Sequence, residues 1–411
     1  MNKRVYQVDE WPGWAKSIPL SLQHLFAMFG ASVLVPMLFG IDVGTVLLFN
    51  GLGTLIYIFL CKGKVPAFLG SSFAFISPVL IVMSSWGYPA ALGGFIACGI
   101  IFVMVALVIR GFGYRWLDVV FPPAAMGAVV AIIGLELAPV AAGMAGLTAK
   151  TTDFKVISVS VFTLATVVFA SVFFRGFFSA IPVLTGIVAG YIMAAMLGMV
   201  DFSSIGAASI VKIPAFVFPV FKTGAIITIL PAAFVVIAEH IGHFIVTEKI
   251  VGKDLRKNPG LHRSMIGDGL STMLSGMFGS VPTTTYGENI GVMAITKVYS
   301  VWVIGGAALI SILLAFFGQF TAVVQSIPAP VIGGVSLLLF GVIAASGIRI
   351  LVESKVDYSQ PKNLVLTSVV LIVGLSGARL DIGSVELKGM ALATILAMML
   401  SLIFALIKKT E

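Results

Sequence analysis

The chain has 411 residues, of which 59% are hydrophobic and only 10% are charged. An ordinary soluble domain carries about 25% charged residues, so the composition excludes a soluble fold. The formal net charge is +8, but the basic residues stand in short loops beside apolar runs instead of forming one patch or tail. That distribution argues against nucleic-acid binding and indicates membrane topology.

Apolar runs near the roughly 20 residues of helix that cross a bilayer recur along the whole chain. They are continuously apolar rather than alternating with a period of two, which predicts helices and not a β-barrel. Breaks rich in charge, proline or glycine divide them into fourteen predicted spans, in an all-α polytopic membrane protein. These spans cover residues 18–38, 44–61, 66–84, 90–109, 122–142, 156–174, 180–199, 224–247, 262–278, 281–296, 300–318, 328–348, 363–379 and 386–407.

Residues 1–17 are polar and mixed in charge, and Trp11 and Trp14 suit a membrane interface. They lack the apolar stretch and cleavage site of a signal peptide, so we expect this segment to be retained. If it is cytoplasmic, most of the 25 Lys and Arg fall on the cytoplasmic side, and an even number of spans places both termini there. These basic residues include Lys62, Lys64, Arg110, Arg115, Lys253, Arg256, Lys257, Lys355, Lys408 and Lys409.

The two halves of the chain share a pattern. Pro123, Gly127 and Gly134 in the fifth span match Pro330, Gly334 and Gly341 in the twelfth, 207 residues later, and the pair Gly93–Gly94 matches Gly305–Gly306. This predicts two seven-span repeats, residues 18–199 and 224–407, joined by a loop at 200–223. Seven is odd, so the second repeat is inverted. Glycine is common in membrane helices, which leaves coincidence as the alternative.

The third and tenth spans are poor continuous helices. The third is interrupted by Gly70-Ser71-Ser72-Phe73, and the tenth contains the stretch from Pro282 to Asn289, with three threonines. Proline, glycine and β-branched threonine lower helix propensity. We therefore expect an extended stretch followed by a half-helix in each, and paired broken spans of this kind indicate a transport site.

Ionisable residues inside membrane spans are costly and are candidates for function. The acidic ones are Glu136, Glu239, Asp268 and Glu288, and the histidines are His24, His240 and His243. Because Glu239 and His243 are four residues apart, they share one helix face and can bond or exchange a proton. We choose Glu239 and Glu288 as the functional pair, with a purely structural role as the alternative, and expect structural roles for Glu136 and Asp268.

A carboxyl group shielded from water can gain and lose a proton as its site opens and closes, which proton coupling requires. Two carboxyls also suit the edge of a pyrimidine, where adjacent N–H and C=O groups need an acceptor and a donor. Phe73, inside the polar break, would supply a stacking surface.

No metal site is expected. Glu239, His240 and His243 do not have the spacing of the zinc-protease helix. Cys61 and Cys98 lie in or at the end of apolar runs and support neither a disulfide nor a thiolate site. An isolated His24 more often forms buried hydrogen bonds.

Three motifs resemble the nucleobase-cation symporter family, which includes uracil, xanthine and ascorbate permeases. They are Gln23-His24, the segment Ala238 to Gly242 with His243, and Glu288-Asn289-Ile290-Gly291 followed by Thr296-Lys297. The second is similar to the corresponding segment of uracil permeases, and the likeness runs over nearly the whole chain.

This resemblance implies a core domain of spans 1–4 and 8–11, a gate domain of spans 5–7 and 12–14, and short antiparallel strands where spans 3 and 10 meet. It implies that Glu239, Glu288 and the backbone at Phe73 and Gly287 bind the substrate, and that His243 supports the proton network. Supporting residues would be Ser72, Gln23, His24, Tyr286 and Asn289.

The resemblance further implies uracil import by proton symport through alternating access, in the cell inner membrane, with no cofactor and with a possible homodimer through the gate domain. Glu288 favours uracil, since purine-selective members tend to carry Gln there. Phe340 stands where a Tyr is expected in close relatives, so any contact of that hydroxyl is absent.

Other interpretations remain open at the level of sequence. One is a purine or xanthine carrier, and another is a sulfate-type anion exchanger, which two buried acids disfavour. The third is an intramembrane enzyme using Glu239, His243 and Glu288, although no serine-nucleophile or zinc-protease motif accompanies them. Sodium and proton coupling can use the same carboxylates.

Overall fold

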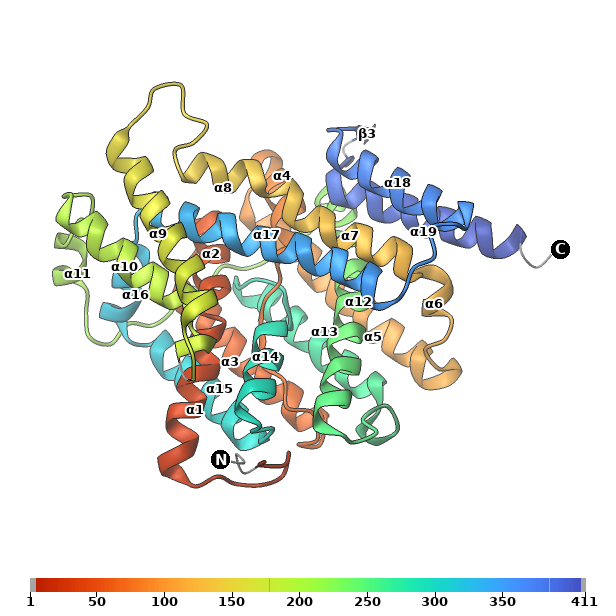
Figure 1. The fold of residues 1–411 in the computed structure, drawn as a ribbon, viewed down its shortest axis with the longest axis horizontal. Helices are drawn as coiled ribbons and strands as arrows, with labels where there is room; N and C mark the ends of the chain where they lie inside the picture. Colours follow the sequence, from red (N-terminus) through yellow and green to blue (C-terminus); the bar gives the residue numbers. More distant parts are fainter. Residues whose placement is uncertain (1–4, 177, 384, 408–411) are drawn as a thin grey trace.

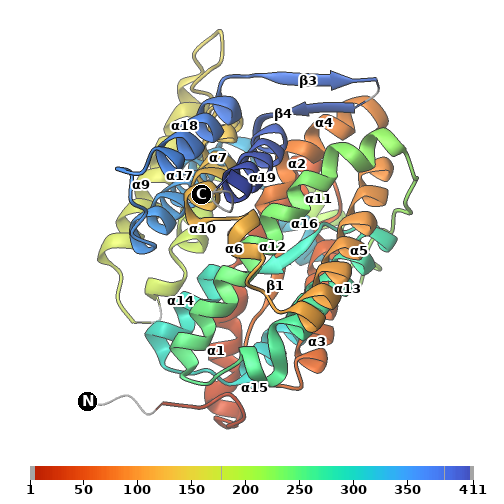
Figure 2. The ribbon, with the colours of Figure 1, turned by 90° about the vertical axis from the view of Figure 1, so that its right-hand side faces the viewer.

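The computed structural model describes residues 5–176, 178–383 and 385–407. Residues 1–4 of the predicted N-terminal segment, and Lys408 and Lys409, lie outside the described residues. The chain is mostly helical, with two pairs of short antiparallel strands (Figures 1 and 2). The strands predicted in the third and tenth spans form one of these pairs.

Most predicted spans of the first half correspond to one or two helices. The elements are α1 (Trp14–Ala27), α2 (Phe29–Phe39), α3 (Val43–Leu60), β1 (Leu69–Ser71), the 3₁₀ helix η1 (Phe73–Phe75), α4 (Ile76–Trp86), α5 (Tyr88–Phe112), α6 (Leu117–Val120), α7 (Pro123–Glu136), α8 (Ala138–Met144), α9 (Phe154–Phe173), η2 (Phe178–Ala180), α10 (Pro182–Met196) and α11 (Ser203–Ala207).

The second half begins with the longest helix of the described chain. Its elements are α12 (Thr223–Val251), η3 (Arg256–Gly260), α13 (Leu261–Phe278), β2 (Thr283–Thr285), α14 (Gly287–Thr296), α15 (Val301–Ala315), α16 (Gly318–Gln325), α17 (Ala329–Glu353), α18 (Pro361–Leu375), β3 (Arg379–Ile382), β4 (Val385–Lys388) and α19 (Gly389–Ile407).

Many of these helices can cross a bilayer. Among the described residues, seven helical segments are long and apolar enough to do so alone, and α1 with α2, bent by 41° at their junction, would make an eighth. Shorter apolar helices cover Phe73–Trp86, Pro182–Met196, Val301–Ala315 and Pro361–Leu375. The protein is therefore a multi-span membrane protein.

The first and the last helix begin at residues other than the predicted span starts. The first helix begins at Trp14, so the end of the predicted N-terminal segment 1–17 is helical. The predicted span 386–407 begins instead with β4, which pairs with β3, and the helix starts only at Gly389. Apolar and polar residues alternate through Arg379–Ile382 and Val385–Lys388, a pattern that favours a strand hairpin over a helix.

The helices pack mainly within two groups (Figure 2). One group contains α1–α5 and α12–α15, and the other contains α7–α10 and α17–α19. Several contacts have a counterpart when the halves are exchanged: α5 packs on α12 and α13, while α15 packs on α1 and α3.

The paired glycines of the two halves lie at these contacts. A Cβ atom on Gly94 would stand 2.7 Å from the side chain of Ile229 on α12, and one on Gly306 would stand 2.5 Å from that of Ser21 on α1. Only a residue without a side chain allows helices to approach so closely.

Candidate functional site

The two broken spans meet in the interior of the protein. β1 pairs with β2 in antiparallel register, with Leu69 opposite Thr285 and Ser71 opposite Thr283, and both strands are fully buried. The side chain of Thr54 on α3 accepts a 2.9 Å hydrogen bond from the Leu69 N–H, which satisfies a strand donor that β2 does not reach. The predicted extended stretches are therefore present.

A half-helix follows each strand. η1 and α4 continue from β1, and α14 starts at Gly287, directly after β2. The first N–H groups of a helix have no partner within it and can donate to a ligand. Because α12 packs against η1, β2 and α14, three segments distant in sequence meet at this junction: the β1–η1 segment, α12 and the β2–α14 segment.

The two predicted acids are brought together here. Glu239 lies half-buried on α12, and Glu288 lies exposed in the first turn of α14. Their carboxyl groups are close enough to interact electrostatically, and Asp268 also lies within range of Glu239. Two neighbouring carboxyl groups repel each other when both are ionised, so simultaneous ionisation is disfavoured.

His243 connects α12 to β2. Its Nδ1 atom lies 3.2 Å from Thr285 Oγ1, and a Cβ atom on Gly287 would stand 3.3 Å from its Nε2 atom. The hydrogen-bond partner of the imidazole is thus Thr285, where the sequence suggested Glu239. In the sequence, Thr285 is visible only as one of three threonines that lower the helix propensity of the tenth span.

His240 points into a buried structural network. Its Nε2 atom lies 2.7 Å from Ser264 Oγ, which is in turn 2.6 Å from the Tyr57 hydroxyl, and its Nδ1 atom lies 3.1 Å from an oxygen of Asp268. These contacts join α3, α12 and α13. No group of three or more His, Cys, Asp or Glu side chains within the described ranges is placed to hold a metal ion.

The half-helix α14 is fixed by the supporting residues. Asn289 Nδ2 donates to His24 Nδ1 at 3.0 Å and to the His24 carbonyl at 3.2 Å. The Tyr286 hydroxyl donates to the carbonyl of Ser71, an acceptor not singled out from sequence. Gln23, next to His24, is buried. Glu288 therefore stands in a helical turn that is held two residues before it, at Tyr286, and one residue after it, at Asn289.

Phe73 faces the other packing group. Its ring meets that of Phe340 on α17 edge to face, with centroids 6.2 Å apart, and Phe340 is buried. The position where a tyrosine was expected is thus in direct contact with the predicted stacking residue.

Several polar atoms around the strand pair are buried without a hydrogen-bond partner in the described part of the chain. They are Ser71 Oγ, Ser72 Oγ, Thr284 Oγ1 and Asn289 Oδ1. Buried polar groups are normally paired. These four atoms can therefore form hydrogen bonds with a ligand bound at the junction.

Glu136 lies elsewhere. Its carboxylate accepts hydrogen bonds from Ser77 Oγ at 2.6 Å and from the backbone N–H of Met390 at 2.9 Å. It joins α7 to α4 and to the first turn of α19, where a negative charge is stabilised by the helix N-terminus. This geometry agrees with the structural role expected for Glu136.

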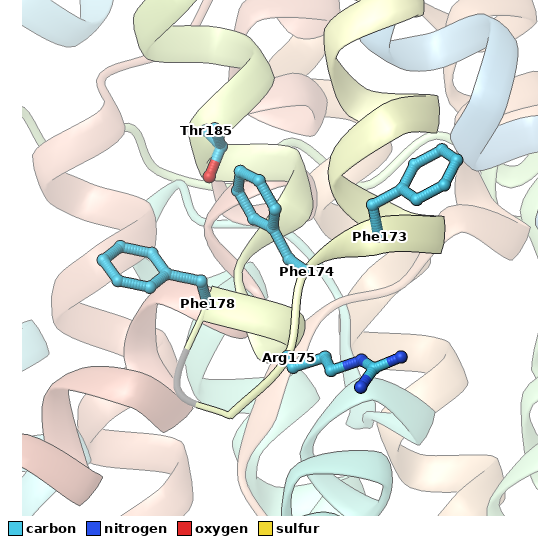
Figure 3. A pocket seen from close by; sticks show the side chains of 5 residues that line it. All are labelled: Phe173, Phe174, Arg175, Phe178 and Thr185. Atoms are coloured by element: carbon cyan, nitrogen blue, oxygen red, sulfur yellow. The ribbon is translucent and has the colours of Figure 1, made fainter.

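A cavity of about 390 Å³ lies at the turn between α9 and α10, and neither Glu239 nor Glu288 lines it. Figure 3 shows its lining side chains, which are Phe173, Phe174, Arg175, Phe178 and Thr185. Its walls are mainly aromatic, with none of the carboxyl or unpaired hydroxyl groups found beside the strands. We therefore place the candidate site at the β1–β2 junction.

The chain is similar to known proteins over nearly its whole length. The chain is 62% identical to a uracil permease of Escherichia coli K12, with 99% of this chain and 95% of the relative covered. It is 59% identical to a uracil permease of Paenibacillus larvae, covering 100% and 99%, and 45% identical to one of Bacillus subtilis, covering 96% and 94%.

Solved structures share the fold at low sequence identity. The transmembrane domain of the cyanobacterial bicarbonate transporter BicA matches with a TM-score of 0.62 at 12% identity, covering 98% of this chain and 99% of that one. The murine anion transporter Slc26a9 matches with a TM-score of 0.74 at 11% identity, covering 97% and 69%.

The sequence profile of the permease family matches residues 15–383, most of the chain. The chain therefore belongs to this permease family, the nucleobase-cation symporters that its motifs indicate, and is a membrane transporter.

Proposed function

We propose that the chain imports uracil together with a proton by alternating access. One observation carries the proposal: Glu239 on α12 and Glu288 in the first turn of α14 lie on two helices that pack together at the junction of the broken spans, in a chain 62% identical to a uracil permease over 99% of its length.

The chemistry of the junction suits a small neutral ring. A carboxylate of Glu239 or Glu288 accepts from a ring N–H, while a protonated carboxyl or the backbone N–H at Phe73 or Gly287 donates to a ring C=O. The unpaired hydroxyls of Ser72 and Thr284 add further partners, and Phe73 offers a stacking face. Glycine at 287 keeps the backbone open beside His243.

Proton coupling follows from the pair of acids. Because like charges at close range disfavour double ionisation, one carboxyl carries a proton while the other accepts a hydrogen bond from the substrate. We assign the transported proton to Glu239, and assign His243, bonded to Thr285, to the supporting network.

For the architecture we propose fourteen spans in two inverted repeats. To the seven long helices and the bent α1–α2 pair, the four shorter apolar helices, α13 and the broken span β2–α14 are added. The exchanged contacts of α5 and α15 support the repeat. The group containing α1–α5 and α12–α15 would be the core, and the group containing α7–α10 and α17–α19 the gate.

We place the protein in the cell inner membrane with both termini cytoplasmic, and propose a homodimer through the gate domain. Exposed apolar side chains on α9 and α10, including Val161, Phe169 and Ile192, give that domain a surface suited to lipid or to a second copy.

The test is uptake of labelled uracil into liposomes containing the purified protein. An inward proton gradient should drive accumulation, and Glu239→Gln and Glu288→Gln should each lower it by about tenfold or more, since a hydrogen bond to a charged group contributes roughly 1.5–3 kcal/mol. Glu353→Gln, at an exposed position, is the matched control. Undiminished uptake by both site variants would refute the proposal.

The same assay separates the alternatives. Strong competition by xanthine would favour a purine carrier. Uptake driven by a sodium gradient in the absence of a proton gradient would show that sodium, not the proton, is the coupling ion. We expect neither.

A further inference from the structure

The N-terminal segment, residues 5–11, crosses the ends of helices that carry the transport site; we call it the N-terminal strap. It runs beside the link between α14 and α15. The Tyr6 N–H donates to the Lys297 carbonyl at 3.0 Å, and the Tyr6 and Val8 carbonyls accept from the N–H groups of Tyr299 and Val301, each at 2.9 Å. The strap is therefore held by backbone hydrogen bonds, as a strand would be.

Two side chains of the strap, those of Tyr6 and Val8, are buried in the protein. Val8 is 2% exposed and forms a small apolar cluster with Val251, Ile290, Met293 and Tyr299. Val251 is the last residue of α12, and Ile290 and Met293 lie on α14. Val8 thus belongs to an apolar cluster to which both helices that carry the two acids contribute.

Polar contacts close the strap over these ends. Trp302 Nε1 donates to the Asp9 carbonyl at 3.3 Å, Ser300 Oγ donates to the Glu10 carbonyl at 2.6 Å, and Lys253 Nζ pairs with the Asp9 carboxylate at 3.2 Å. A hydrogen bond from its own backbone N–H, and then Lys253, hold the pKa of Asp9 below its usual value of 3.8. The Asp9–Lys253 ion pair is therefore present at every pH above this lowered pKa of Asp9 and is lost only at more acidic pH. It does not change over the physiological pH range.

The half-helix α14 needs such a support. It has only 10 residues, so its orientation depends on the contacts that it makes with neighbouring elements. Ile290, which belongs to the same apolar cluster as Val8, is two residues from Glu288. Glu239 lies on the other supported helix, 12 residues before Val251 and so about 18 Å along its axis.

We propose that the N-terminal strap is a positioning element of the transport site, in which Val8 fixes α14, and with it Glu288, against α12. This inference rests on the proposed function, because it assigns Glu288 to substrate binding. Val8 is a positioning residue, since it acts through Ile290 and touches no substrate.

The test compares Val8→Asp with Val5→Asp in the full-length chain in liposomes. Val5 is 44% exposed, so the control adds the same charge to the strap without entering the cluster. Val8→Asp should raise the KM for uracil by about tenfold, because the interaction energy between packed residues is large enough for a change of this size. Val5→Asp should leave KM unchanged. Val8→Ile, which keeps an apolar side chain, should restore a KM near that of the wild type.

Val8→Ala guards against loss of folding and should raise KM by about two- to fivefold. A maximal rate that falls with the amount of folded protein, at unchanged KM in both Val8→Asp and Val8→Ala, would overturn the inference and leave the strap as a stabilising element only. Failure of the wild type to take up uracil would instead contradict the proposed function.

Discussion

The contact between Phe73 and Phe340 joins the candidate site to the opposite packing group. The rings meet edge to face, and α17, which carries Phe340, belongs to the proposed gate. A gate movement must therefore break or reorient this contact, and the character of residue 340 should affect binding without supplying a charge.

We predict that Phe340→Tyr keeps uracil transport and changes KM by less than about tenfold, because a neutral hydrogen bond contributes roughly 0.5–1.5 kcal/mol. Phe340→Ala should be more harmful, since it leaves a cavity beside Phe73. KM and maximal uptake of both variants are to be measured in liposomes. Loss of transport in Phe340→Tyr would mean that no hydroxyl can be accommodated at this position.

At the scale of elements, the close approach of β1 to β2 depends on a glycine. A Cβ atom on Gly70 would stand 2.0 Å from the ring of Tyr286, whose hydroxyl bonds to Ser71. A side chain there must displace the ring or separate the strands.

We therefore predict that Gly70→Ala loses uracil binding, measured by isothermal titration calorimetry on the solubilised protein. Gly111→Ala is the control, because no atom lies within 4 Å of a Cβ at that position of α5 and alanine favours a helix. Equal affinities for the two variants would show that Tyr286 can move without cost to the site.

The broken spans were predictable because proline, glycine and threonine act on the backbone locally, and the two acids because charge is rare in membrane helices. The partners of these residues were not predictable in the same way. The bonds of His243 to Thr285 and of Tyr286 to Ser71 join residues far apart in sequence. The β3–β4 hairpin was missed although its alternation is visible, because four residues next to an apolar run are easily assigned to the helix.

Across the whole molecule, the halves of the chain make corresponding contacts although their sequences differ. Gly94 meets Ile229 of α12, and Gly306 meets Ser21 of α1. Each half thus supplies one broken span and one close helix contact to the same group of helices. An odd number of spans per half would then place the two broken spans in opposite directions, as the antiparallel pairing of β1 with β2 requires.

This arrangement predicts on which side of the membrane each turn lies. Lys150, in the exposed turn before α9, and Lys257, exposed after α12, are separated by the crossings of α9, α10 and α12. Three crossings put them on opposite sides, and the excess of basic residues puts Lys257 inside. In intact cells a membrane-impermeant maleimide should label Lys150→Cys and reach Lys257→Cys only after permeabilisation. The native Cys61 and Cys98 are buried, so background labelling should be low. Labelling of both variants from outside would show that an even number of crossings separates the two positions, which would contradict the inverted repeat.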